Sequence, residues 1–189
     1  MSAATKTAAR RIHRLPGDPL PADQLARMIR VDHAGEYGAA RIYDGQLAVL
    51  GRSRAAGAVR EMAEQEKRHL AEFERLIAAH RVRPTVLAPL WHIAGFALGA
   101  ATALLGERAA MACTVAVEEV IDDHYRAQGE ALGEGEAALR ATIDEFRADE
   151  GVHRATALAH GAREMLGYEA LSSVVKAGSR LAIWLSTRI

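Results

Sequence analysis

The stretch VREMAEQEKRHLAEFERL, residues 59–76, carries a glutamate and a histidine on an apolar helical face. Residues three or four apart lie on one side of an α-helix, and one such stripe here is Val59, Met62, Glu66, His69 and Phe73. A stripe of this kind faces the protein core, where an unpaired carboxylate costs several kcal/mol. Glu66 and His69, about one helical turn apart, are therefore expected to bind a common partner.

A second copy of this arrangement follows later in the chain. The sequence EGVH at residues 150–153 repeats the Glu-x-x-His spacing. Each copy is preceded by a glutamate in another apolar stripe: Glu36 lies 30 residues before Glu66, and Glu118 lies 32 residues before Glu150. Two helix pairs that each supply one Glu and one Glu-x-x-His form the ligand pattern of bundles that hold two iron or manganese ions. The repeat predicts a site of this type.

Two alternatives stay open at this point. A single Glu-x-x-His match arises easily by chance, so the residues could be polar positions on partly exposed helix faces. The matching frames of the two copies favour the metal site instead. Periodicity does not separate Glu118 from its neighbour Glu119 as a ligand. Carboxylate and imidazole groups without thiolate suit iron or manganese better than a structural zinc ion.

The composition of the 189-residue chain favours one all-α domain. Half of the residues are apolar, and strand-forming residues never gather in alternating runs. Lys+Arg and Asp+Glu balance at 24 each, which argues against a nucleic-acid partner. The lone cysteine, Cys113, excludes an internal disulfide or a multi-cysteine metal site, and we expect it to be a small buried apolar residue.

Glycine and proline divide the chain into a tail and six helices. We predict a flexible N-terminal tail at 1–19 and one domain at 20–189. The tail lacks the apolar segment of a secretory signal, and a short transit peptide is the alternative to a bacterial tail. The predicted helices span about 21–51, 55–80, 86–105, 107 to a Gly/Glu-rich loop at 129–135, 136–166 and 169–187.

The third predicted helix is unusually apolar. Residues 84–106 contain no charge over 23 positions, which meets the length requirement for a membrane span. Pro89, His92 and several glycines argue against spanning, so an interfacial helix that dips into lipid is the favoured interpretation, with a buried core helix as the other alternative. In the last helix, Trp184 with Arg180 and Arg188 is typical of an interfacial anchor.

Whole segments around the predicted ligands resemble the demethoxyubiquinone hydroxylase family of ubiquinone biosynthesis. These segments include IRVDHAGEYGAA at 29–40, RVRPTV at 81–86 and ACTVAVEE at 112–119, and the resemblance runs from about residue 25 to the C-terminus. It implies an all-α, ferritin-like four-helix bundle with two additional apolar or amphipathic helices. It also implies two iron ions per chain and selects Glu118 over Glu119. The implied ligands are Glu36 and His69 for one iron, Glu118 and His153 for the other, and Glu66 and Glu150 as bridges.

The resemblance also implies a reaction. The family is a di-iron monooxygenase that uses O₂ to hydroxylate a polyprenylated methoxy-methyl-benzoquinol, with NADH as the expected reductant. It suggests that His124 and Tyr125 contact the substrate or transfer electrons, with ordinary packing as the alternative. From helical spacing we expect Asp32 and Asp122 to orient the histidine ligands.

The setting expected for such an enzyme is a membrane surface. We predict peripheral attachment to the cytoplasmic face of the bacterial inner membrane, and a homo-oligomer or a ubiquinone-biosynthesis complex as the assembly. A ferritin-like protein that handles iron or peroxide at a membrane is the alternative function, because it shares the ligand set. It would have no use for the long apolar third and sixth helices.

Overall fold

The computed structural model describes residues 20–189, and the predicted tail at 1–19 lies outside them. The described residues form six α-helices and two short 3₁₀ turns, and they contain no strand. The all-α prediction is confirmed. The elements are α1 (Ala22–Leu50), α2 (Ala56–His80), α3 (Ala88–Leu104), α4 (Glu107–Ala131), η1 (Glu134–Glu136), α5 (Ala137–Ala159), η2 (Ala162–Glu164) and α6 (Tyr168–Ser186).

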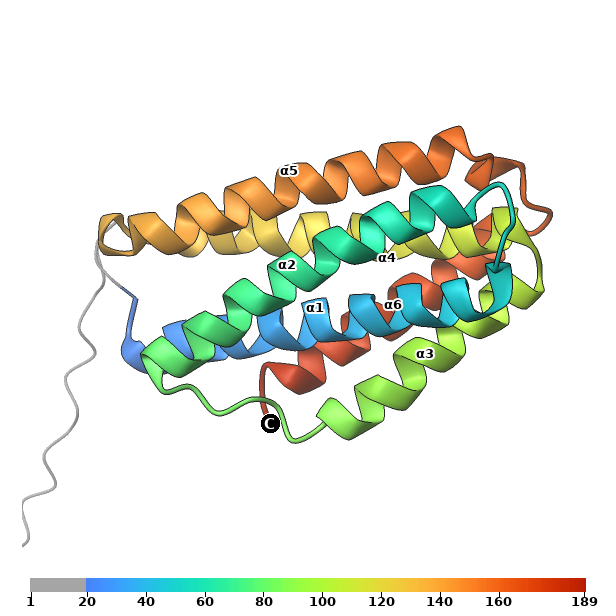
Figure 1. The fold of residues 1–189 in the computed structure, drawn as a ribbon. Coiled ribbons are helices and arrows are strands. Elements are labelled where there is room, and N and C mark those ends of the chain that lie inside the picture. Colours follow the sequence, from blue (N-terminus) through green and yellow to red (C-terminus); the bar gives the residue numbers. More distant parts are fainter. Residues whose placement is uncertain (1–19) are drawn as a thin grey trace, which may run out of the picture.

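The helices lie in three layers of two helices each (Figure 1). The hairpins α1–α2 and α4–α5 lie against each other as a four-helix bundle, with α2 and α5 on one side and α1 and α4 in the middle. The additional helices follow on the opposite side, where α3 packs on α1 and α6 packs on α4. This is the ferritin-like arrangement that the sequence resemblance implied.

The helices end close to their predicted limits, with one exception, and residues with positive φ angles mark several of these ends. The φ angle of Gly51, 55°, ends α1, and Arg81 at φ 52° ends α2. The fifth helix was predicted to reach residue 166, but it ends at Ala159. Gly161 at φ 80° and Gly167 at φ 82° form two left-handed turns there, with η2 between them. That prediction was wrong because glycine adopts positive φ without steric cost and so permits the early stop.

Glycines bring α1 and α3 into backbone contact. A Cβ added at Gly99 would lie 1.9 Å from the carbonyl oxygen of Ile42, and one at Gly45 would lie 2.1 Å from that of Phe96. A Cβ at Gly95 would lie 2.9 Å from the carbonyl oxygen of Gly38. All three values are shorter than any real contact, so the two helices approach this closely only because these positions lack side chains.

The apolar core is split into two clusters, one towards each end of the bundle. One contains Ile29, Phe73 and Ile143, and the other contains Val59 and Met111. The six predicted ligands occur between these two groups along all four helices of the bundle. The middle of the bundle is therefore polar although it is buried.

A substitution at Gly99 tests the contact between α1 and α3. We expect Gly99→Ala to lower the free energy of unfolding by about 1–3 kcal/mol, because the new methyl group forces the helices apart. Gly57→Ala is the matched control: its Cβ would meet no atom within 4 Å, so it should be neutral or slightly stabilising. Urea denaturation measures both, and equal stability of Gly99→Ala and the wild type would contradict the close contact.

Candidate metal centre

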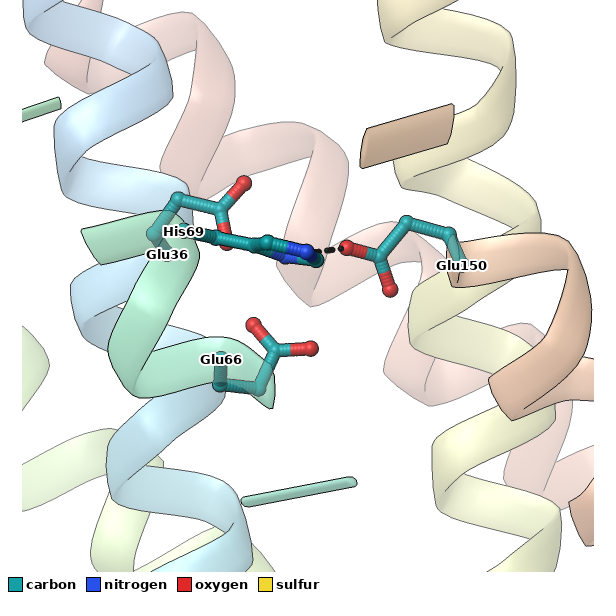
Figure 2. Close-up of side chains that lie close together, drawn as sticks. All are labelled: Glu36, Glu66, His69 and Glu150. Atoms are coloured by element: carbon teal, nitrogen blue, oxygen red, sulfur yellow. Dashed lines mark ion pairs between the residues drawn. The ribbon is translucent and has the colours of Figure 1, made fainter. Parts of the chain in front are cut away.

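The structure brings all six predicted ligands together in the middle of the bundle. Glu36 comes from α1, Glu66 and His69 from α2, Glu118 from α4, and Glu150 and His153 from α5. Each is at most 1% exposed. They form two overlapping groups whose ligand atoms lie within 4.8 Å of one another: Glu36, Glu66, His69 and Glu150 (Figure 2), and Glu66, Glu118, Glu150 and His153.

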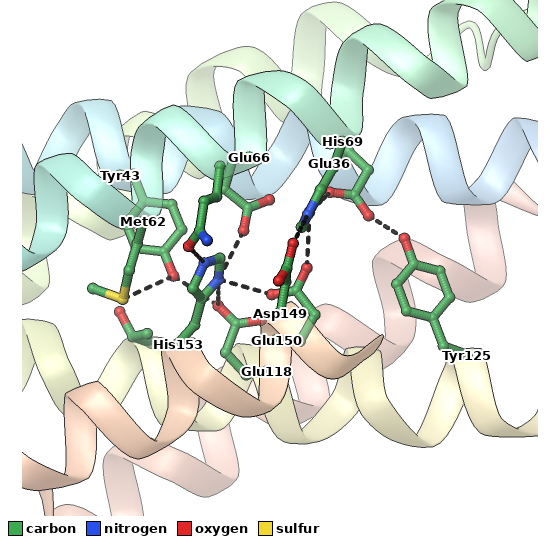
Figure 3. A network of polar contacts seen from close by, with 12 residues as sticks. Glu36, Tyr43, Met62, Glu66, His69, Glu118, Tyr125, Asp149, Glu150 and His153 are labelled. Carbon is green, nitrogen blue, oxygen red and sulfur yellow. Dashed lines mark hydrogen bonds and ion pairs between the residues drawn. The ribbon is translucent and has the colours of Figure 1, made fainter. Parts of the chain in front are cut away.

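The two histidines turn the same ring nitrogen towards the carboxylates. Nδ1 of His69 lies 3.2 Å from Oε1 of Glu150 and 3.5 Å from Oε2 of Glu36. Nδ1 of His153 lies 2.9 Å from Oε2 of Glu150 and 3.2 Å from Oε1 of Glu66. Glu150 thus faces both histidines, one with each oxygen, and lies between the two groups (Figure 3).

The donor set fits divalent metal ions. Several buried ligand atoms have no hydrogen-bond partner among residues 20–189, including both carboxylate oxygens of Glu66, Oε2 of Glu36 and Oε2 of Glu118. Buried polar atoms without partners are costly, and four carboxylates packed together also repel one another. Cations between them would remove both costs. The two overlapping groups offer room for one ion each, with Glu66 and Glu150 common to both.

Burial and mutual repulsion shift the ionisation of these groups. Burial, followed by the charge of Glu150, raises the pKa of Glu66 and of Glu118 well above the usual carboxyl range. Burial acts in the same direction on Glu150, but hydrogen bonds from His153 and His69 outweigh it and lower its pKa to about 2. Burial would lower the pKa of His69, yet the nearby carboxylates of Glu150 and Glu36 raise it to about 10. Without metal the cluster retains protons that bound cations would displace.

The Nε2 atom of each ligand histidine bonds the residue that directly precedes the Glu-x-x-His motif of the other helix. Nε2 of His69 on α2 donates to Oδ2 of Asp149 on α5 at 3.0 Å. Nε2 of His153 on α5 donates to Oε1 of Gln65 on α2 at 2.7 Å. These bonds fix both ring orientations and turn Nδ1 of each ring towards the carboxylates, where it could bind a metal ion.

The predicted role of Asp32 and Asp122 was wrong. Asp122 accepts a hydrogen bond from Nε of Arg147 at 2.6 Å, and Asp32 bonds to His124 and Gln128. Neither aspartate bonds a ligand histidine, because helical spacing relates residues of one helix, whereas the histidines lie on α2 and α5. The signal that sequence reasoning missed was the position directly before each motif glutamate, which is polar in both copies, as Gln65 and Asp149.

Glu36 and Glu118, the outer glutamates of the cluster, each accept a hydrogen bond from a tyrosine of the other hairpin (Figure 3). The Tyr125 hydroxyl on α4 donates to Oε1 of Glu36 on α1. The Tyr43 hydroxyl on α1 donates to Oε1 of Glu118 on α4 at 2.7 Å. Each tyrosine comes seven residues after the glutamate on its own helix, and sequence reasoning singled out Tyr125 but not Tyr43. His124 contacts Asp32 rather than the carboxylate cluster.

A cavity of about 340 Å³ opens on one side of the centre, between α1, α3, α4 and α6. Its walls are mainly apolar and include Val31, Leu98 and Ile121. Its polar lining contains Glu36 and Tyr125 from the centre, together with Asp32 and His124. Glu118, at the other end of the cluster, is not among the lining residues. The two halves of the centre therefore differ in access although their residues repeat.

The outer faces of α3 and α6 expose large apolar side chains. On α3, Ile93 is 68% exposed, and on α6, Leu181 and Trp184 are 56% and 51% exposed. The buried residues of α3 are Gly95, Gly99, Thr102 and Ala103, so the interpretation of α3 as a core helix is wrong. Among residues 20–189, no helix combines the length and the apolar character that crossing a membrane would need.

Fold and site together define a class: four helices that bury four glutamates and two histidines form a helix bundle whose central carboxylate–histidine cluster could hold metal ions. Sequence comparison gives the family. The chain belongs to the family described as ubiquinone biosynthesis protein COQ7, whose pattern matches residues 23–186. The predicted resemblance is thereby confirmed.

Individual relatives cover most of the chain. A 3-demethoxyubiquinol 3-hydroxylase of Rhodospirillum rubrum is 59% identical over 93% of this chain and 84% of its own length. The Homo sapiens NADPH-dependent 3-demethoxyubiquinone 3-hydroxylase, mitochondrial, is 52% identical over 86% of this chain and 77% of its own. The Saccharomyces cerevisiae 5-demethoxyubiquinone hydroxylase, mitochondrial, is 40% identical over 87% and 78%, respectively.

The bond between His69 and Asp149 can be tested through metal affinity. Asp149→Ala should weaken binding of divalent metal by about 10–100-fold, because His69 loses the partner that fixes its ring. Glu145→Ala removes an exposed carboxylate of the same helix and serves as the control. Competition with a chromophoric chelator measures both affinities. Equal affinities in the two variants would show that Asp149 does not support a metal ligand.

Proposed function

We propose that this chain is a di-iron monooxygenase of ubiquinone biosynthesis that hydroxylates the ring of a demethoxyubiquinol. The observation that carries the proposal is the buried carboxylate–histidine cluster with an apolar cavity on one side, in a chain of the COQ7 family. The names of its relatives specify hydroxylation of this substrate class. An iron-storage or peroxide-handling role would leave the apolar cavity without a purpose.

We assign Glu36 and His69 to one iron and Glu118 and His153 to the other, with Glu66 and Glu150 as bridging ligands. The assignment is supported by the two overlapping groups, since Glu66 and Glu150 belong to both. Iron held by carboxylate and imidazole ligands supplies the activation of O₂. The protein's own residues hold the ligands: tyrosine hydroxyls orient the outer glutamates, while Asp149 and Gln65 orient the histidines.

The cavity is the proposed site of the quinol ring. Its volume of about 340 Å³ lies within the usual range of small-molecule pockets, and its walls are mainly apolar. Leu98 of α3 and Leu181 of α6 line it, and Leu181 is also exposed on the outside. A polyprenyl tail would leave between these two helices towards the apolar outer surface, while the ring stays beside Glu36.

The reaction consumes an external reductant. One oxygen atom of O₂ enters the ring and the other leaves as water, so two electrons and two protons are needed for each turnover. We propose a reduced nicotinamide nucleotide as their source. The sequence-based prediction was NADH, whereas the names of the mitochondrial relatives from Dictyostelium discoideum and Homo sapiens specify NADPH.

We further propose peripheral attachment to a membrane through the outer faces of α3 and α6. This is supported by the exposed side chains of Ile93 and Trp184, and by Arg188, whose guanidinium lies 4.1 Å from the Trp184 ring centroid. A lipid-soluble substrate would then enter directly from the bilayer. The cytoplasmic face of the inner membrane and assembly into an oligomer or a biosynthetic complex stay predictions.

Adjacent glutamates on α4 provide a test of the ligand assignment. Glu118→Ala should lose metal and reduce hydroxylation at least 100-fold, because the ligands of such a centre act as a unit. Glu119→Ala should stay near wild type, since Glu119 forms an ion pair with Lys176 away from the cluster. Elemental analysis measures the metal content of both variants. The mass of the quinol product, formed with iron, O₂ and NAD(P)H present, measures hydroxylation, and together they show which substitution is more damaging. The reverse order would refute the assignment.

The membrane proposal is tested with vesicles of phosphatidylglycerol and phosphatidylcholine. The double substitution Ile93→Asp, Trp184→Asp should release the protein, because each charge near the hydrocarbon costs about 2–3 kcal/mol. Val152→Asp places the same charge on α5, where Val152 is 57% exposed, and should leave binding unchanged. Flotation measures the bound fraction. Unchanged flotation of the double variant would exclude α3 and α6 as the attachment surface.

A further inference from the structure

The repeat of the two hairpins extends beyond the metal ligands. Glu36 and Tyr43 recur 82 residues later as Glu118 and Tyr125. The same shift relates two buried glutamines, Gln46 and Gln128, and each again reaches across to the opposite hairpin. Nε2 of Gln46 donates to Oγ1 of Thr114 at 3.3 Å, and Nε2 of Gln128 donates to Oδ1 of Asp32 at 2.6 Å.

The hydrogen-bond partners of these two glutamines differ in residue type between the two halves of the repeat. Thr114 and Asp32 occupy equivalent positions, four residues before the outer glutamate of each half. The threonine is neutral and lies in the half away from the cavity, whereas the aspartate is acidic and lines the cavity. In the same way, His124 stands where the other half has Ile42. A carboxylate and an imidazole thus lie on the open side, where the equivalent positions of the closed half hold a threonine and an isoleucine.

One carboxylate oxygen of Asp32 has hydrogen-bond donors, and the other has none among residues 20–189. It is 2% exposed, and its Oδ1 accepts hydrogen bonds from Nε2 of His124 at 3.0 Å and from Nε2 of Gln128 at 2.6 Å. Its Oδ2 has no hydrogen-bond partner among residues 20–189. Burial raises the pKa of the Asp32 carboxyl, while the bonds from His124 and Gln128 oppose this shift. A buried acceptor without a donor is costly unless a ligand supplies the donor.

We propose that Oδ2 of Asp32 accepts a hydrogen bond from a ring hydroxyl of the quinol and so makes the cavity selective for the reduced ring. This inference rests on the proposed function and adds a binding residue to it. Asp32 lies four residues before Glu36 on α1, which is about 6 Å along the helix axis. A hydroxyl bound at Asp32 therefore holds the neighbouring ring carbons beside the metal centre.

The chemistry of this corner favours a hydroxyl donor over other ligands. A cation would meet two donors, His124 and Gln128, which already point at the same carboxylate. The oxidised quinone carries carbonyl oxygens, which offer the carboxylate no proton. The hydroquinone offers two hydroxyl groups on a flat apolar ring, which matches one polar corner in an apolar cavity.

Equilibrium binding of three ligands to the metal-loaded protein without O₂ tests this directly. The ligands are a short-tailed methoxy-methyl-hydroquinone, its dimethyl ether and the corresponding quinone, each in detergent. We expect the wild type to bind the hydroquinone about 10–100-fold more tightly than the other two ligands, because a hydrogen bond to a charged group contributes about this much to affinity. Asp32→Asn should lose most of this preference. Thr114→Val, the equivalent change in the closed half, should retain it.

The ratio of affinities is the readout, because partial loss of folded or metal-loaded protein does not change it. Asp32→Ala is judged on the same ratio and serves as the second variant. Equal binding of all three ligands by the wild type overturns the inference, as does a preference that both Asp32 variants keep. Conversion of the hydroquinone by the wild type is followed separately by product mass, so failure of the proposed function is distinguished from failure of this inference.

Discussion

Mutual repulsion of four buried carboxylates is the constraint on which this structure depends. Glu36, Glu66, Glu118 and Glu150 meet in the middle of a bundle where water does not screen them. Two imidazoles contact these carboxylates, and several carboxylate oxygens have no hydrogen-bond donor among residues 20–189. A core of this composition is stable only with cations or protons between the carboxylates. The energetic cost of the cluster without metal therefore favours the binding of cations.

The supporting contacts all cross between hairpins. Tyr125 on α4 holds Glu36 on α1, and Asp149 on α5 holds His69 on α2. Each half of the repeat is thus oriented by the other half, so neither hairpin could form the centre alone. This crossing explains how a repeated sequence pattern can build one shared cluster rather than two separate clusters.

Access to the centre depends on helices outside the bundle. Gly45 and Gly99 allow α3 to lie in backbone contact with α1, and this position places Leu98 on the cavity wall. α6 forms the facing wall from its position against α4. The same two helices expose apolar side chains on their outer faces. These two helices therefore provide walls of the cavity proposed for the ring as well as the surface proposed to meet lipid.

The sequence by itself determined the helical class, five of the six helix ends to within a few residues, and the six residues of the cluster. Helical periodicity carries most of this information, because a charged residue on an apolar stripe is visible without coordinates, whereas the choice of Glu118 over Glu119 came from the family resemblance. The sequence-based prediction misplaced the end of the fifth helix, because glycine permits a turn there that hydrophobic periodicity does not reveal. Only the tertiary structure decided which residues hold the histidines, that Tyr43 takes part, and that Asp32 faces a cavity. These facts depend on contacts between helices distant in the chain, and spacing along one helix cannot specify its neighbour.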